Sequence, residues 1–126
     1  MIIGIGIDVV HVSRLERWSE ISGILSRYFN EKELAEAETR GHARVLSLAA
    51  RFAVKEAFGK ALGTGLRGIA LRDIMVENNH NGKPDVRLYG NALKAFEEVG
   101  GTSLHVSLTH EKDNAIAVII IEGGAA

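Results

Sequence analysis

Three charged residues on two well-separated segments have the types and spacing that phosphate chemistry requires. Asp8 ends the apolar segment GIGID near the N-terminus, and Glu56 and Lys60 lie four residues apart in a helical segment. Two carboxylates in a chain without cysteine favour a hard cation such as Mg²⁺, which keeps water ligands and accepts phosphate oxygens as further ligands. We therefore expect a magnesium–phosphate site if the fold places Asp8 opposite the helix.

Glu56 and Lys60 also have the order of an ordinary helix ion pair, which contributes about 0.3–0.5 kcal/mol. At about 100° per residue, both project from the face that carries Ala49, Phe52 and Ala53. A carboxylate on such a face is costly to bury unless a cation or a metal meets it. Both interpretations stay open. The other cations of this segment form a separate strip: Arg44, Arg51 and Lys55.

The glycines that follow Lys60 offer a second phosphate contact. Gly63, Thr64 and Gly65 present backbone N–H groups and a hydroxyl. The segment is not a P-loop, because the lysine precedes the glycines, and GIGID is not a dinucleotide fingerprint, because its glycines lie inside a strand. The simpler interpretation is that Gly63 and Gly65 end the helix.

The histidines give a weaker signal. No pair among the five has HxxxH or HExxH spacing, which argues against a zinc site. His110 ends a predicted strand beside Thr109 and would bind phosphate when protonated, although a histidine there is more often an ordinary surface residue.

The elements that must position these residues are predicted from periodicity and end signals. Residues 2–10 form a strand with Ile3, Ile5, Ile7 and Val9 on one side and Asp8 on the other, with the glycines. The spacings Ser13–Glu16 and Asn30–Glu33 predict capped helix starts. The further predicted elements are helices at 31–40, 42–62 and 91–99, the last with Asn91 as its cap, two strands within 69–90 joined at Asn81-Gly82, and a hairpin of 103–109 with 115–122.

Composition limits the classes of protein. The 126 residues carry 46% hydrophobic side chains and a net charge of −1, which predicts one domain, 1–126. We expect an α+β fold with helices packed on a small, largely antiparallel sheet. The charge argues against a nucleic-acid partner, and the lack of a long apolar run argues against a membrane partner. With no cysteine and no leader pattern, we expect a cytoplasmic protein.

Four segments together resemble a known family. They are GIGID at 4–8, RFAVKEAFGKALGTG at 51–65, NGKP at 81–84 and HVSLTH at 105–110. In this order they resemble the short bacterial phosphopantetheinyl transferases of the holo-acyl-carrier-protein synthase family. The resemblance covers nearly the whole chain, and the second segment with its upstream GID is highly specific.

The resemblance implies a reaction and a set of roles. The reaction is Mg²⁺-dependent transfer of 4′-phosphopantetheine from coenzyme A to a serine of acyl carrier protein in fatty acid biosynthesis, releasing adenosine 3′,5′-bisphosphate. Glu56, or water on the metal, is the candidate acceptor of the serine proton. The implied site residues are Asp8 and Glu56 for the metal, Lys60 for the phosphates of coenzyme A, Gly63 and Thr64 beside them, Thr109 and His110 near the 3′-phosphate, and Arg14 with Arg17 and Trp18 for carrier docking.

Two further expectations follow from the resemblance. The chain holds a single half of the longer two-half members, which implies a homotrimer with sites between subunits. Many members carry a glutamate where this chain has His11, which bears on the support of the metal. The alternative function is a small module that holds Mg²⁺ and a nucleotide or phosphate without catalysis.

Overall fold

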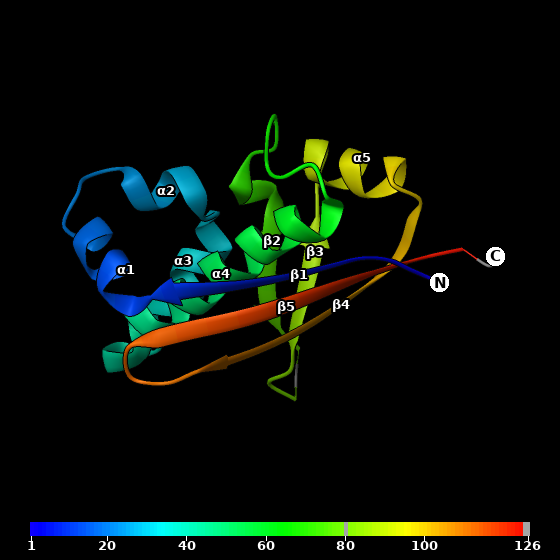
Figure 1. Ribbon diagram of the computed structural model, residues 1–126. Coiled ribbons are helices and arrows are strands. Elements are labelled where there is room, and N and C mark those ends of the chain that lie inside the picture. The colour runs from blue at the N-terminus through cyan, green and yellow to red at the C-terminus, as the bar shows by residue number, and fades with distance from the viewer. Residues whose placement is uncertain (80, 125–126) are drawn as a thin grey trace.

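A computed structural model describes residues 1–79 and 81–124. Its main sheet has three antiparallel strands in the order β1-β5-β4 (Figure 1). The strands are β1 (Ile2–His11), β4 (Gly101–His110) and β5 (Asn114–Gly123). β5 is central, so β1 and β4 form the two edges of the sheet.

Helix α4 (Arg44–Leu62) packs against one face of this sheet. The contact is close because β1 carries glycine where the helix crosses it. A Cβ atom at Gly4 would overlap the carbonyl oxygen of Ala61, and one at Gly6 would overlap that of Ala57. The space that these glycines leave beside Asp8 is therefore filled by the helix backbone.

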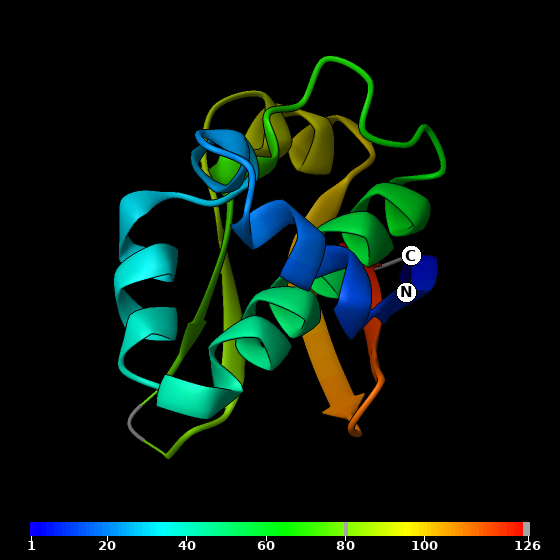
Figure 2. The ribbon, with the colours of Figure 1, turned by 90° about the vertical axis from the view of Figure 1, so that its left-hand side faces the viewer.

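The remaining elements lie on the same side of the sheet as α4 (Figure 2). Strands β2 and β3 pair antiparallel as a second, two-stranded sheet. The predicted α+β class, with helices on small antiparallel sheets, is confirmed. These elements are α1 (Val12–Ser19), α2 (Ile24–Tyr28), α3 (Glu31–Glu38), η1 (Gly41–Ala43), η2 (Leu71–Asp73), β2 (Ile74–Asn78), β3 (Pro84–Leu88) and α5 (Gly90–Glu98).

The predicted capping box at the start of α3 is confirmed. The Asn30 side chain accepts a hydrogen bond from the Glu33 backbone N–H at 3.0 Å, and the Glu33 carboxylate accepts one from the Asn30 N–H at 3.2 Å. Helix α2 was not anticipated from the sequence; it spans only five residues, too few for a periodic pattern.

Two other predicted caps are wrong. His11, not Ser13, is the N-cap of α1, because β1 continues into this helix without a loop. Tyr89, not Asn91, is the N-cap of α5, and the Asn91 side chain instead donates a hydrogen bond to the Gly68 carbonyl at 3.1 Å.

Two predicted boundaries shift as well. Residues 41–43 form a 3-10 turn, so α4 begins at Arg44 rather than at residue 42. The strand predicted from Ile69 begins at Ile74, after the turn η2. The buried Lys55 ammonium donates hydrogen bonds to the carbonyls of Leu71 and Ile74, which lie at this shifted start. The periodicity of a strand does not reveal these contacts.

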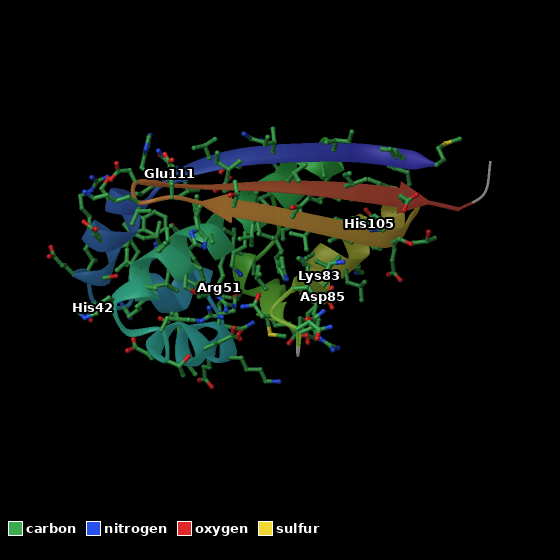
Figure 3. The ribbon with its side chains drawn as sticks, turned by 90° about the horizontal axis from the view of Figure 1, so that it is seen from below. His42, Arg51, Lys83, Asp85, His105 and Glu111 are labelled. Atoms are coloured by element: carbon green, nitrogen blue, oxygen red, sulfur yellow. The ribbon has the colours of Figure 1, made fainter. Side chains whose placement is uncertain are left out.

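The outer face of the three-stranded sheet is open, and it is apolar on β1 and β5, whereas β4 adds the exposed His105, Ser107 and Thr109. Ile5, Ile7 and Val9 are 59%, 58% and 53% exposed, while the opposite face of the sheet lies on the core. Figure 3 shows this sheet along one side of the molecule, with the helices and the short sheet on its other side. Within residues 1–79 and 81–124, no helix combines the length and the apolar character needed to cross a bilayer.

Candidate functional site

The structure brings Asp8 to the C-terminal half of α4, which is the condition set above for a metal–phosphate site. The Lys60 ammonium donates a hydrogen bond to Asp8 Oδ1 at 2.9 Å. The Asp8 side chain is 17% exposed, whereas that of Lys60 is 56% exposed and reaches solvent. The ammonium of Lys60 therefore binds the carboxylate of β1 and not Glu56, so the simple helix ion pair is wrong.

Glu56 lies half-buried beside this pair. Burial raises the pKa of the Glu56 carboxyl above its usual value, and the negative charge of Asp8 raises it further. The cations Arg14 and Lys60 act in the opposite direction. A carboxyl that is partly desolvated next to a second carboxylate would be stabilised in its charged form by an added cation.

Asp8 and Glu56 fit a divalent cation of the magnesium type. They offer hard oxygen donors from a rigid strand and a rigid helix. In the described part of the chain, no cluster of three or more histidine or carboxylate residues has metal-site geometry. The further ligands would thus be water and substrate oxygens, which is the way Mg²⁺ is commonly held beside phosphates.

The glycines after α4 end the helix, as one of the two interpretations predicts. Gly63 takes the left-handed conformation at the helix C-cap, with φ of +83°. The Gly65 N–H then bonds back to the Gly59 carbonyl at 3.1 Å, and Leu66 covers Gly59. This return leaves Gly63 and Thr64 exposed next to Lys60.

The predicted docking residues of α1 differ in how firmly their side chains are held by contacts. The Arg14 guanidinium lies 4.9 Å from the Trp18 ring centroid and 5.0 Å from that of Phe52. Trp18 is half-buried and stacks on Tyr28, with ring centroids 5.1 Å apart. Trp18 therefore supports Arg14 from within an aromatic cluster, and both Arg14 and Arg17 are exposed.

His110 lines a hollow of about 180 Å³ at the β4 edge, and its basic wall was not recognised from the sequence. Arg51, assigned above only to a cationic strip, is 3% exposed and donates to the Val76 carbonyl. Its guanidinium also pairs with Glu36 at 2.8 Å. Figure 3 shows Arg51 on the side of α4 toward the short sheet. The hollow is lined by polar residues including Arg40, Ser47, Arg51, Asn78 and His110.

Thr109 and His110 do not face the same way. Thr109 pairs with Ile116 and lies on the outer, apolar face of the sheet, because neighbouring residues of a strand alternate between its faces. His110 lies on the inner side, in the hollow. Of the two predicted nucleotide contacts, only His110 shares a site with Arg51.

The predicted metal group and the predicted nucleotide contact His110 lie at opposite edges of the three-stranded sheet. Asp8 is on β1, and His110 is on β4, with β5 between them. Glu56 and Arg51 are five residues apart on α4, which turns their side chains about 140° from one another. One chain thus presents a carboxylate–lysine group and a separate arginine–histidine hollow.

A family model described as the 4′-phosphopantetheinyl transferase superfamily matches residues 4–119. The chain belongs to this superfamily. The family predicted from the four sequence segments is thereby confirmed.

Related transferases match this one over their whole length. A holo-[acyl-carrier-protein] synthase of Treponema denticola is 56% identical and covers 98% of this chain and 100% of its own. The crystal structure of the synthase of Neisseria meningitidis is 39% identical, with a TM-score of 0.85, and covers 97% of this chain and 99% of its own. The synthase of Bacillus anthracis, solved in complex with CoA (3′,5′-ADP), is 32% identical with a TM-score of 0.82, covering 98% and 99%.

Proposed function

We infer that this transferase moves the 4′-phosphopantetheine group of coenzyme A to a serine of an apo acyl carrier protein. The synthases that resemble it over nearly its whole length carry this activity in their name, and one was solved with coenzyme A. The observation that carries the proposal is the meeting of Asp8, Glu56 and Lys60 at the crossing of β1 and α4. The holo carrier protein formed would serve fatty acid biosynthesis.

Asp8 and Glu56 would hold the magnesium ion through one carboxylate each. When bound, Mg²⁺ offsets the charge of the phosphates and orients the displacement. Lys60, which is the most exposed member of the group, would leave Asp8 to bind a phosphate oxygen of coenzyme A. Its fixed positive charge then lies where the leaving phosphate gains negative charge. Gly63 and Thr64 would line the same phosphates.

In the reaction, the serine hydroxyl oxygen attacks the phosphorus that carries the pantetheine arm. A new bond from serine oxygen to phosphorus forms, and the bond from that phosphorus to the bridging oxygen breaks. Adenosine 3′,5′-bisphosphate leaves with the bridging oxygen, and the serine proton passes to a base. Glu56 is the candidate base from this chain, although a carboxylate that holds a metal accepts protons poorly.

The nucleotide end of coenzyme A would lie in the hollow of Arg51 and His110. A guanidinium and a protonated imidazole are suited to a 3′-phosphate. Because α4 separates this hollow from Asp8 within one chain, we propose that a neighbouring chain supplies it. Each site would then combine the β1 edge of one subunit with the β4 edge of the next.

The proposed assembly is a homotrimer built on the outer face of the sheet. This face carries Ile5, Ile7 and Val9 on β1, all more than half exposed. Contiguous apolar patches of this kind on small proteins commonly mark subunit interfaces. Half-buried residues of the central strand extend the patch: Ile116, Val118 and Ile120.

Carrier docking is proposed for α1, with Arg14 as its central cation. Acyl carrier proteins are acidic, so a fixed arginine beside the catalytic carboxylates would orient the bound carrier protein. Arg14 is held over two aromatic rings, which lowers the entropy lost on binding. Arg17 adds an exposed charge on the same helix.

The test is a transfer assay with coenzyme A, Mg²⁺ and an apo acyl carrier protein. We expect the carrier mass to rise by one phosphopantetheine group and adenosine 3′,5′-bisphosphate to form. Binding of coenzyme A with no carrier modification, under conditions in which a control synthase works, would instead support the non-catalytic binding module.

A further inference from the structure

A buried ion pair lies on the far side of α4 from Asp8. The ammonium of Lys55 is 2.8 Å from Glu33 Oε1, and both side chains are fully buried. The same ammonium donates to the Leu71 carbonyl at 2.8 Å and to the Ile74 carbonyl. All three of its protons are therefore used by protein acceptors.

Both carboxylate oxygens of Glu33 also accept hydrogen bonds from the backbone. Its Oε1 accepts from the Asn30 N–H at 3.2 Å, and its Oε2 accepts from the Val76 N–H at 3.1 Å. The pair thus ties α4 to the start of α3, to η2 and to β2. Two side chains connect four elements without contacting the catalytic carboxylates.

The ion pair is a costly way to obtain stability. Burial lowers the pKa of Lys55 to about 8, because the interior disfavours the charged ammonium. Buried ion pairs are frequently no more stabilising than apolar side chains of the same volume. Their best-supported contribution is to specify one register among several packings.

The face of α4 toward β1 does little to fix the rotation of the helix, because this face is nearly smooth. It meets Gly4 and Gly6 through the backbone at Ala61 and Ala57. Contacts of glycine and alanine provide few ridges that would resist rotation or sliding of the helix. Lys55 directly precedes Glu56, so a rotation that moves Lys55 moves Glu56 by the same angle.

We propose that the Lys55–Glu33 pair positions the catalytic end of α4 by setting the rotation and axial position of this helix. The pair keeps Glu56 and Lys60 directed at Asp8, although it touches neither substrate nor metal. Lys55 and Glu33 are thus positioning residues for the transfer reaction. The inference rests on the proposed roles of Asp8, Glu56 and Lys60.

The test replaces the pair by apolar residues of similar volume, Lys55→Met with Glu33→Leu. We expect an unfolding midpoint below that of the parent, because the Val76 N–H and the Leu71 and Ile74 carbonyls lose their partners. In the folded variant we expect a kcat lower by about tenfold or more, because small displacements of catalytic groups carry costs of this size. The amide pair Lys55→Gln with Glu33→Gln, which keeps polar contacts, should recover most of kcat. Lys94→Met with Glu97→Leu on the exposed face of α5 is the matched control.

A coupling measurement separates positioning from general stability. In a Glu56→Gln background, the apolar pair should lower the residual kcat by a clearly smaller factor than in the parent, since one of the two groups that it positions has been removed. An equal loss in both backgrounds overturns the inference. So does full activity of the apolar pair, or failure of both pair variants to fold, because the pair would then be dispensable or purely stabilising.

The proposed function fails separately from this inference. If Glu56→Gln alone keeps full turnover, the metal assignment is wrong, and an inactive apolar pair could no longer act through Glu56. If Glu56→Gln is inactive while the apolar pair is fully active, the metal assignment stands and only the positioning role is overturned.

Discussion

Gly6 of β1 lies directly on the backbone of Ala57 in α4, so closely that a methyl group at Gly6 would overlap the Ala57 carbonyl oxygen. This contact sets the distance between the strand that carries Asp8 and the helix that carries Glu56 and Lys60. The proposed catalytic group of Asp8, Glu56 and Lys60 therefore depends on a glycine that bears no functional atom.

Gly6→Ala is expected to push α4 from β1 and to separate Lys60 from Asp8. Overpacking of this kind destabilises by about 1–3 kcal/mol, and turnover should fall by about a hundredfold. Urea unfolding and the carrier-modification rate measure the two effects. Gly124→Ala, at a glycine with open space around it, is the control. Full turnover of Gly6→Ala would show that this close contact is not required.

Asp8→Asn and Glu56→Gln are expected to lower Mg²⁺-dependent turnover strongly, to a small residual rate, while the fold persists. Loss of one charged ligand should lower kcat by a factor on the order of a hundred or more. Circular dichroism checks the fold, and removal of the metal with EDTA should reproduce the loss in the parent. Glu98→Gln on the exposed face of α5 serves as the control. Unchanged turnover in both variants would refute the metal assignment.

Magnesium affinity is expected to fall as the pH is lowered. The fall should begin at a higher pH than it would if the pKa of Glu56 had its usual value. Burial and the charge of Asp8 raise the pKa of Glu56, and the metal binds only the deprotonated carboxylate. Protons therefore compete with Mg²⁺ as the pH falls through this raised value. Titrations of activity against Mg²⁺ between about pH 5 and 8 measure the effect. A magnesium requirement independent of pH over this range would contradict it.

Arg14→Glu is expected to weaken carrier binding strongly and coenzyme A binding little. Trp18→Leu should give a smaller loss of the same kind, because it removes one of the two rings that hold the guanidinium. KM for the carrier and KM for coenzyme A, measured separately, distinguish the effects. Equal losses for both substrates would argue against docking on α1.

Ile7→Glu on the outer face of the sheet is expected to dissociate the assembly. A charge in the centre of an apolar interface has no partner, and its burial is costly. Analytical ultracentrifugation should show a trimer for the parent and a monomer for the variant, with turnover lost because each site needs two chains. Exposed Leu93 on α5 provides the control variant Leu93→Glu. A monomeric parent with full turnover would exclude the shared site.

Local signals were reliable where one short segment contains the whole interaction. Asn30 and Glu33 satisfy each other within one helical turn, so their spacing alone identified the start of α3. Ser13 and Glu16 have the same spacing and do not form a cap, because the preceding strand continues into the helix and His11 takes the cap position. Whether two residues with this spacing form a cap therefore depends on the neighbouring residues as well as on the two residues themselves.

The cations of α4 show the limit of helical geometry. The sequence predicts their angles on the helix, but Arg51 and Lys55 are buried, whereas Lys60 is exposed and bound to Asp8. The angle of a residue around the helix shows which residues share a face. It does not show which other element packs on that face. The partners of Lys55, from Glu33 to Ile74, come from three other elements.

By itself, the sequence determined the family, the fold class and the residue types of the site, because these depend on motifs and periodicities within continuous segments. Only the tertiary structure decided that Lys60 binds Asp8 and that Arg51 joins His110 at the opposite edge. These two arrangements bring together residues that are 52 and 59 positions apart in the chain. They depend on the crossing of α4 over glycines of β1 and on the order of the strands, which no local pattern specifies.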